Sequence, residues 1–325
     1  MSSSIKDSIY RAIDVIENSK NIFIASHVNP DGDNMGSMLA LALALKKAGK
    51  NVVVLKSDTI PEDYKFLPGI QLIQEYRQEL GNIDVFIALD TSDEERLGDN
   101  LSLLKKANCI INIDHHITST GFGDINIVDG KAAATGELIY YFIKQMEIEL
   151  DKDIGTNLYT AISTDTGKFS YESVTSNTHR IIAELIDLGI DFKQINIELY
   201  ESMSIEKTKL FIEAISSLKT YENSNIATIK VTQDMLKNSG ASMEDTEGLV
   251  SFIRKIASVE VACLLKEIED DNIKISLRSK NMVDVASICG KFGGGGHIRA
   301  AGCSISSNID DAEDMIVDKI KEYIR

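Results

Sequence analysis

Hydrophobic residues in the first half of the chain occur in two kinds of segment. Short, continuous apolar runs are typical of buried strands, and four of them occur, at 21–25, 51–55, 83–89 and 109–113. Segments such as 5–16 and 35–48 instead carry apolar residues at helical spacing, and a long helix is also predicted at 132–150. Strands that are apolar throughout must be covered on both faces. The alternation therefore predicts an α/β domain with a doubly wound, mainly parallel sheet.

A second set of elements begins near residue 218, after a polar stretch without a strand pattern. Strands are predicted at 226–231, 259–265 and 273–277, and helices at 246–256, 282–289 and 310–324. This pattern predicts a smaller α/β domain. The predicted organisation is a first domain over 1–190, a partly helical connector over 191–215 and a second domain over 216–325.

Residue types that bind metal ions follow three of the four predicted strands. They are His27, Asp31 and Asp33 after the first strand, Asp90 after the third, and Asp114-His115-His116 after the fourth. Because parallel strands end at one edge of the sheet, where ligands bind, these side chains are expected to converge. Carboxylates and imidazoles suit divalent ions such as manganese, magnesium or zinc. Asp165, which follows the predicted helix 154–162, is a further candidate ligand.

The acidic segment Ser26–Asn34 also has a simpler interpretation. Asn-Pro and Asp-Gly are ordinary turn residues, so this segment alone fits a solvated surface turn equally well. An EF-hand is excluded, because Met35 stands at the third ligand position and no glutamate closes the loop. Chance explains one acidic turn more easily than ligand-type residues at three separate strand ends, so the metal site is the preferred interpretation.

Composition narrows the range of functions. The 325 residues carry a formal net charge of −16, which argues against a protein that tracks long nucleic acids, since such proteins need a basic surface. No run approaches the roughly 18 apolar residues of a membrane span, and residues 1–11 lack a signal-peptide core. The four scattered cysteines form no Cys-x-x-Cys pair, which fits reduced thiols. A cytoplasmic protein without a membrane partner is expected.

A glycine-rich segment stands out in the second domain. Four consecutive glycines, Gly293–Gly296, are followed by His297 and Arg299. A flexible linker is one interpretation. The flanking Phe, His, Arg and Ala-Ala-Gly favour instead a loop whose backbone approaches a phosphate or base, with His297 and Arg299 as donors. Arg278, at the end of a predicted strand, is a further candidate cation.

The candidate ligands suggest hydrolysis of a phosphoester or phosphoanhydride. Four carboxylates and three imidazoles exceed what one ion requires, and they suit two divalent ions about 3.5–4 Å apart that share a carboxylate. Asp90, at a central strand end, fits the bridging role. A histidine outside the ligand set, of which His116 is the candidate, could donate to the phosphoryl oxygen or leaving group. The sequence shows neither a Walker loop nor a dinucleotide-binding fingerprint.

Asp114-His115-His116 resembles the signature of the DHH phosphoesterases. The segments His27-Val-Asn-Pro-Asp31-Gly-Asp33, Ala88-Leu-Asp90 and Ser163-Thr-Asp165-Thr-Gly-Lys-Phe169 resemble the other metal motifs of that family. Gly293–Gly296 with His297 and Ala300-Ala301-Gly302 resembles its DHH-associated C-terminal domain. An architecture of two such domains is most similar to the nanoRNase and pAp-phosphatase branch.

This resemblance implies a site with two divalent ions, most often manganese. His27, Asp31 and Asp90 would hold the first ion, and Asp33, Asp90, His115 and Asp165 the second. His116 would contact the reacting phosphate, and Asp114 would orient the histidine pair. The far end of the nucleotide would be bound, across a cleft between the domains, by Gly294, Gly295, Gly296, His297, Arg299 and Arg278.

The implied substrates are short RNA oligonucleotides, linear dinucleotides such as pApA, and 3′-phosphoadenosine 5′-phosphate (pAp). Cyclic di-AMP is the alternative substrate, because soluble relatives of similar two-domain form cleave it. A nucleotide sensor without turnover is the alternative from another class, although the intact metal set argues against it. An oligomeric scaffold lacks a supporting apolar pattern, while homodimerisation through the connector stays open. The sequence leaves cleavage polarity, base preference and the physiological metal undetermined.

Overall fold

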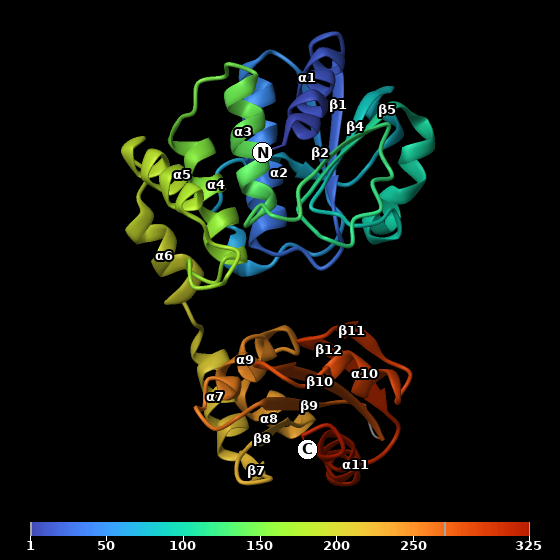
Figure 1. Cartoon of the computed structure of the whole chain (residues 1–325), viewed down its shortest axis with the longest axis vertical. Coiled ribbons are helices and arrows are strands. Elements are labelled where there is room, and N and C mark those ends of the chain that lie inside the picture. The colour runs from blue at the N-terminus through green and yellow to red at the C-terminus, as the bar shows by residue number, and fades with distance from the viewer. Residues whose placement is uncertain (1, 270, 325) are drawn as a thin grey trace. The chain divides into compact units, whose positions relative to one another are not determined.

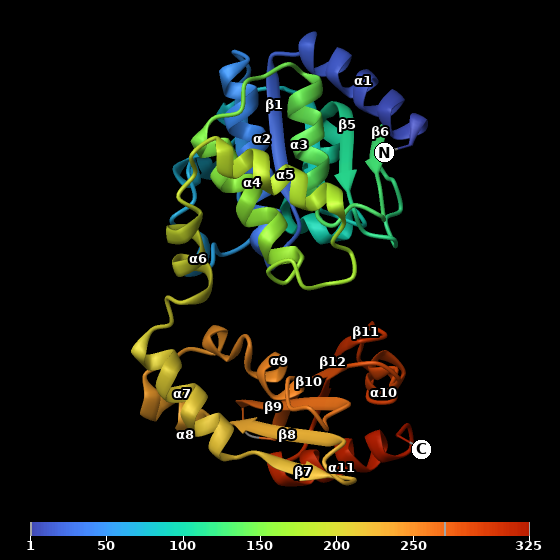
Figure 2. The same ribbon diagram turned by 60° about the vertical axis from the view of Figure 1, so that its left-hand side comes forward.

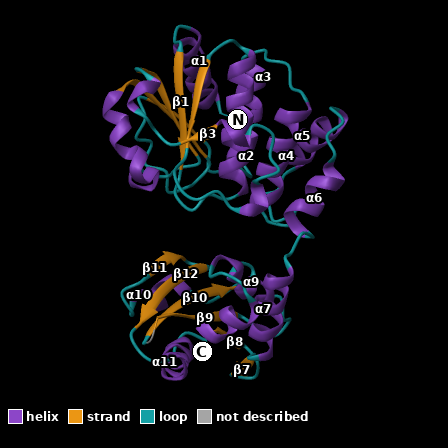
Figure 3. Ribbon diagram, turned by 180° about the vertical axis from the view of Figure 1, so that it is seen from behind, coloured by secondary structure: helices purple, strands orange, loops and turns teal. Residues whose placement is uncertain are grey.

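The computed structural model describes residues 2–269 and 271–324. It contains two compact units, Met1–Ser202 and Met203–Arg325, each with its own sheet and hydrophobic core (Figures 1 and 3). The segment predicted as a connector, 191–215, is largely occupied by two helices, α6 (Phe192–Tyr200) in the first unit and α7 (Ile205–Ser216) in the second. Among the described residues, no helix combines the length and apolar character needed to cross a membrane.

The first unit is built on a six-stranded sheet with the order β3-β2-β1-β4-β5-β6. Its strands are β1 (Asn21–Ser26), β2 (Asn51–Leu55), β3 (Ile73–Gln74), β4 (Ile83–Leu89), β5 (Ala107–Asp114) and β6 (Ile125–Val128). Every pairing in this sheet is parallel. The predicted doubly wound parallel sheet is therefore confirmed, and the four apolar runs are its central strands. The edge strands β3 and β6 were not predicted, because each is short and only partly buried.

Successive residues of the central strands pack into two different hydrophobic cores, one on each face of the sheet. In β1, Ile22 and Ile24 face the helical layer, which consists of α1 (Ser3–Glu17), α2 (Gly32–Lys47), α3 (Thr135–Gln145) and α4 (Lys152–Asp165). Figure 2 shows α2, α3 and α4 on one side of the sheet, together with α5 (Ser176–Asp187). Phe23 and Ala25 face the opposite core, which is closed by the 3₁₀ segment η4 (Glu95–Lys106). Both faces are covered, as the continuous apolar strands require.

Two helix boundaries differ from the prediction in ways that affect the site. Helix α2 begins at Gly32, three residues earlier than predicted, because the Asp31 side chain accepts a hydrogen bond from the Asn34 amide at 3.0 Å and caps the helix. Asp33 consequently lies in the first helical turn instead of a loop. Helix α3 is shorter than the predicted segment 132–150, and just beyond its end Glu147 has a left-handed backbone with φ of 55°.

The second unit contains another six-stranded sheet, with the order β11-β12-β10-β9-β8-β7. Its strands are β7 (Lys219–Tyr221), β8 (Ile226–Val231), β9 (Val261–Glu269), β10 (Asn272–Ser279), β11 (Gly295–His297) and β12 (Ala300–Ile305). Only the β8–β9 pairing is parallel among the pairings of these described strands. The linker interpretation of the glycine run is wrong, because Gly295–His297 form a strand that pairs with β12.

Helices cover both faces of the second sheet. They are α7, α8 (Gln233–Ser239), α9 (Leu249–Arg254), α10 (Val285–Gly290) and α11 (Ile309–Lys321). One core joins the sheet to α10 and α11, and the other joins it to α7, α8 and α9. Short 3₁₀ turns complete the described structure, at η1 (Glu62–Tyr64), η2 (Ile70–Leu72), η3 (Gln78–Leu80) and η5 (Glu244–Thr246).

Candidate metal centre

The metal ligands predicted from the sequence meet beyond the carboxyl ends of the parallel strands. His27 follows β1, Asp90 follows β4, and His115 follows β5, while Asp31 and Asp33 lie at the start of α2 and Asp165 ends α4. Within the described residues, ligand atoms that lie within 4.8 Å of one another form three groups. These are His27/Asp31/Asp90, Asp33/His115/Asp165 and Asp90/His115/His116. The structure thus brings all six predicted ligands, and His116, into one cluster.

Asp90 is a member of two of these groups and contacts a histidine in each. Its Oδ2 atom is 3.3 Å from His27 Nε2, and its Oδ1 atom is 3.7 Å from His115 Nε2. The residue is only 2% exposed, and its backbone has a left-handed φ of 53°. Such strain in a non-glycine residue is typical of functional sites. The two oxygens of one carboxylate therefore face two different histidines, as a bridge between two cations requires.

In both His27 and His115, one ring nitrogen contacts a backbone carbonyl oxygen and the other faces the carboxylates of the cluster. His27 Nδ1 lies 2.7 Å from the carbonyl oxygen of Val28, and His115 Nδ1 lies 3.4 Å from that of Ala132. A carbonyl oxygen only accepts hydrogen bonds, so both Nδ1 atoms act as donors. When a ring is neutral, its Nε2 lone pair is therefore left for a cation, whereas a protonated His27 donates from Nε2 to Asp90 instead. The neutral tautomer, fixed by a bond on the opposite nitrogen, is the one that a metal-binding histidine uses.

Asp33 is held by the amino end of α3 instead of by its own helix alone. Its Oδ2 atom accepts from the amide of Thr135 at 2.6 Å, and its Oδ1 atom accepts from the amide of Gly136 at 2.8 Å. The Ser37 hydroxyl donates to Oδ1 at 2.9 Å. A carboxylate offers about four acceptor positions, so Asp33 keeps capacity for a cation.

The electrostatics of the cluster favour bound cations. Burial raises the pKa of Asp33 well above its usual range, and the nearby charges of Asp90 and Asp165 raise it further. Burial also raises the pKa of Asp165, to about 6. Burial alone would raise the pKa of Asp90, but the His27 hydrogen bond and the charge of His115 lower it to about 2. Crowded carboxylates and neutral imidazole nitrogens form a hard donor set, and divalent ions fit it.

His116 is oriented by a buried carboxylate. Its Nδ1 atom lies 2.7 Å from Oδ1 of Asp114, which is fully buried, whereas 28% of the His116 side chain is exposed. The hydrogen bond that His116 donates to Asp114 raises the pKa of His116. Asp114 does not belong to any of the three ligand groups. The Asp114–His116 pair therefore presents an accessible imidazole beside the candidate cation sites, with its ring direction fixed from behind.

Comparison with known proteins identifies the family to which this chain belongs. Two family patterns match the chain, "DHH family, N-terminal domain" over residues 21–162 and "DHHA1 domain" over residues 223–325. A bifunctional oligoribonuclease and PAP phosphatase, NrnA, of Thermus thermophilus is 30% identical over 93% of this chain and 90% of its own length. This chain belongs to the DHH family. As a member of that family it is a metal-dependent phosphoesterase.

Two further relatives cover nearly the whole DHH chain. NrnA of Bacillus subtilis, also named a bifunctional oligoribonuclease and PAP phosphatase, is 27% identical over 97% of both chains. The crystal structure of an exopolyphosphatase-related protein of Bacteroides fragilis is 30% identical and has a TM-score of 0.91. That match covers 98% of this chain and 96% of the solved one.

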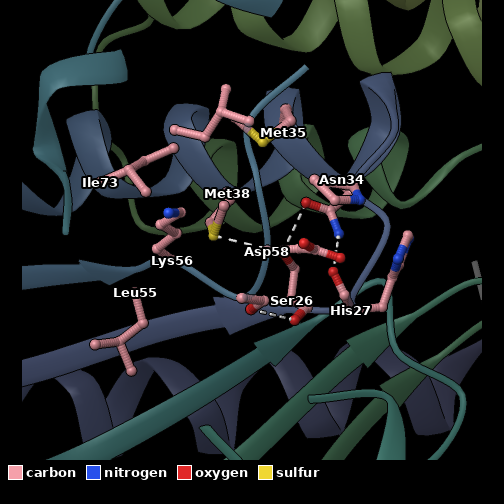
Figure 4. A pocket seen from close by; sticks show the side chains of 12 residues that line it. Ser26, His27, Asn34, Met35, Met38, Leu55, Lys56, Asp58 and Ile73 are labelled. Carbon is pink, nitrogen blue, oxygen red and sulfur yellow. Dashed lines mark hydrogen bonds between the residues drawn. The ribbon is translucent and has the colours of Figure 1, made fainter. Parts of the chain in front are cut away.

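Sequence reasoning missed residues that hold the DHH site from behind. Figure 4 shows Ser26 and Asn34 beside His27 in a small pocket at the end of β1. The Ser26 hydroxyl donates to Asn34 Oδ1 at 2.7 Å, and Asn34 Nδ2 donates to the His27 carbonyl oxygen at 3.1 Å. These bonds fix the strand end that carries His27 to the first turn of α2. The available signal was their position, since both are polar residues that border the acidic motif.

The glycines of the DHHA1 domain have different roles in the structure. A side chain at Gly294 would place its Cβ atom 2.5 Å from that of Cys303, and one at Gly296 would lie 2.5 Å from the Ala300 carbonyl oxygen. Gly296 also has a φ of 142°. Both glycines are therefore needed for close packing of β11 on β12. Gly295 and His297 are exposed, and the position of a Cβ atom at Gly295 is open. Their contact with substrate stays a prediction.

The two candidate arginines of this domain bond to nearby backbone. The Arg299 guanidinium donates to the carbonyl oxygens of Asn281 and Val283, the latter at 2.9 Å. Arg278 donates to the carbonyl oxygen of Leu277 at 3.0 Å. Arg299 thereby ties the turn after β11 to the 281–283 loop, a structural role that the sequence did not suggest. Substrate binding by Arg278 and Arg299 stays a prediction.

Proposed function

We propose that this DHH phosphoesterase uses two manganese ions to hydrolyse short oligoribonucleotides, and linear dinucleotides such as pApA, to mononucleotides. The same site would hydrolyse pAp to AMP. The observation that carries the proposal is the placement of Asp90, whose two oxygens face His27 and His115 in different ligand groups. The names of the Thermus and Bacillus relatives, at 30% and 27% identity, support the choice of substrates.

The proposed ligand assignment follows the observed groups. His27, Asp31 and Asp90 would hold one ion, and Asp33, Asp90, His115 and Asp165 would hold the other. Ions bound there would lower the pKa of a shared water and neutralise the oxygens of the phosphate under attack. The chain's own contribution is the preorganised geometry. Hydrogen bonds that Thr135 donates to Asp33 and Asp90, and the bond that His27 donates to a backbone carbonyl oxygen, fix these side chains before substrate arrives.

His116 is proposed to act on the phosphate itself. Because Nδ1 is bound to Asp114, Nε2 is the ring nitrogen that remains to contact substrate. The raised pKa of His116, caused by the Asp114 hydrogen bond, favours a protonated ring that can donate from Nε2. The proton would pass to the leaving oxygen as its bond to phosphorus breaks, while the water oxygen forms the new bond. No covalent enzyme intermediate is needed in this scheme.

The second unit is proposed to bind the part of the nucleotide that does not react. His297 and Gly295 are exposed there, and Gly295 leaves open space for a close backbone approach. The net charge of −16 disfavours long nucleic acids, which supports short substrates. His297→Ala is expected to raise KM for pApA about tenfold with a small change in kcat. Lys291→Ala, an exposed change in the same segment, serves as the control.

Product analysis by chromatography tests the proposed function. Purified protein with Mn²⁺ is given pApA, pAp, cyclic di-AMP and a long single-stranded RNA in parallel, with Asp90→Ala as the inactive control. Inorganic polyphosphate is added to the panel because the Bacteroides relative is described as exopolyphosphatase-related. AMP from pApA and pAp, with slow loss of the others, is the expected result. Equal rates on long RNA and pApA would refute the proposed length selection.

The alternatives predict different outcomes in the same assay. Rapid opening of cyclic di-AMP would reassign the substrate to a cyclic dinucleotide. Ligand binding without product, unchanged in Asp90→Ala, would indicate a sensor. The cytoplasmic location and a homodimer remain part of the proposal. Size-exclusion chromatography with light scattering tests the homodimer, and a mass equal to one chain would contradict it.

A further inference from the structure

Thr135 lies outside the candidate ligand set and yet contacts two of its members. It is the first residue of α3 and is fully buried. Its amide donates to Asp33 Oδ2 at 2.6 Å, and its hydroxyl donates to Asp90 Oδ1 at 3.0 Å. Asp33 and Asp90 belong to different ligand groups. One residue therefore connects the two halves of the candidate centre.

The capping pattern of α3 explains why this residue is available. The first amides of a helix lack partners within the helix and are usually satisfied by a polar N-cap side chain. Here the N-cap residue is Ala134, which provides no such group. The Asp33 carboxylate from α2 accepts from the amides of Thr135 and Gly136 instead. The Thr135 hydroxyl is consequently not needed as a cap and donates to Asp90.

The hydroxyl contact acts on the atom that decides the bridging geometry. Asp90 Oδ1 is the oxygen that faces His115, while Oδ2 faces His27. A rotation of the carboxylate would move both oxygens at once. Thr135, Asp33 and Asp90 are each at most 2% exposed, so bulk water does not replace a lost hydroxyl. The left-handed backbone of Asp90 also needs surroundings that hold it.

We propose that Thr135 is a positioning residue that fixes the Asp90 carboxylate between the two cation sites through its hydroxyl. This inference rests on the proposed two-metal function. Hydrogen-bond partners of metal ligands typically contribute 10- to 100-fold to metal affinity or activity. Thr135→Val keeps the side-chain shape and the backbone amide to Asp33, and it replaces only the hydroxyl, with a methyl group. Thr135→Ser keeps the hydroxyl and removes only a methyl group.

The test compares Mn²⁺ binding by calorimetry in the full-length wild type, Thr135→Val, Thr135→Ser and a matched control. Thr160→Val is that control, because Thr160 is also fully buried and its hydroxyl has no hydrogen-bond partner among the described residues. Thr135→Val is expected to bind at least one Mn²⁺ roughly 10- to 100-fold more weakly. Thr135→Ser and Thr160→Val are expected to stay within about threefold of wild type.

Kinetic and melting-temperature measurements distinguish a positioning role of the Thr135 hydroxyl from a general loss of folding stability in the variant. Thr135→Val is expected to lose kcat on pApA with little change in KM at saturating Mn²⁺, and Thr135→Ser is expected to restore it. Wild-type Mn²⁺ affinity and kcat in a folded Thr135→Val would overturn the inference. Equal losses in Thr135→Val and Thr135→Ser would also overturn it, because packing would then be the cause. A wild type that binds no Mn²⁺ would instead refute the proposed function.

Discussion

The Asp114–His116 pair allows a quantitative prediction about catalysis. Asp114→Asn keeps the size of a fully buried side chain and replaces its charge. The 2.7 Å bond from His116 Nδ1 then loses its anionic acceptor and keeps a neutral one. Hydrogen bonds to charged groups contribute about 1.5–3 kcal/mol and neutral ones about 0.5–1.5 kcal/mol, so roughly 1–1.5 kcal/mol is lost. Since 1.36 kcal/mol is a factor of ten, kcat is expected to fall about tenfold.

The assay is steady-state hydrolysis of pApA, combined with calorimetric titration of Mn²⁺. Because Asp114 does not belong to the candidate ligand groups, Mn²⁺ affinity is expected to stay within about threefold of wild type. Asp99→Asn, an exposed change of the same kind in η4, is the control and should leave both quantities unchanged. A parallel loss of Mn²⁺ affinity would show that Asp114 acts on the metal site instead.

A double-mutant cycle tests the route of the effect. If Asp114 acts only through the imidazole, Asp114→Asn should cost less than about twofold in kcat when His116 is already alanine. A second tenfold loss in the His116→Ala background would refute the reasoning, because another contact of Asp114 would then carry the effect.

Three further outcomes are expected. Burial alone would raise the pKa of Glu313, but hydrogen bonds from two lysines and a threonine lower it to about 2, from 4.5 in the unfolded chain. Its contribution of about 3 kcal/mol to the free energy of unfolding should be present above pH 4.5 and fade toward pH 2. The free energies of unfolding measured with urea at pH 7 and pH 3 should therefore differ by less in Glu313→Gln than in wild type. Gly36→Ala should lower stability by about 1–3 kcal/mol in the same assay, because its Cβ atom would overlap the carbonyl oxygen of Asn157, whereas Gly290→Ala has free space and should not. Removal of divalent ions by a chelator should lower the melting temperature. Mn²⁺ at about 100 times its Kd should restore about 2.7 kcal/mol of the free energy of unfolding. A melting temperature that the chelator leaves unchanged would argue against the site.

The parts of the fold that the sequence predicted are those with a strong local pattern. Strands β2 and β4 have the predicted bounds, because each is a mostly apolar run in which the only polar residue, Asn51 or Asp84, lies at or next to its start. Strand β11 was missed, since glycine has little tendency to form strands and offers no side chain to pack. Its pairing with β12 arises from main-chain hydrogen bonds within the sheet, which local composition does not encode.

The same distinction holds at the site. Asp90 and His115 were predicted because strand ends in a parallel sheet share one edge, so a local pattern was enough to place them together. Thr135 was not predicted, because its partners Asp90 and Asp33 lie 45 and 102 residues away in the sequence. Contacts over such separations depend on how helices pack, and neither periodicity nor motif spacing specifies that packing.

Helix packing and metal binding in the first unit depend on each other. A Cβ atom at Gly136 would lie 2.7 Å from that of Ala161, so only glycine lets α3 approach α4 this closely, and the same position lies beside Asp33 Oδ1. The approach lets Asp33 cap α3, and that cap is strongest when the carboxylate is ionised. Burial opposes ionisation by raising the pKa of Asp33. A bound cation reverses that opposition. Metal binding should therefore stabilise the α2–α3 contact as well as supply the chemistry, and packing changes at Gly136 should weaken Mn²⁺ binding without touching a ligand.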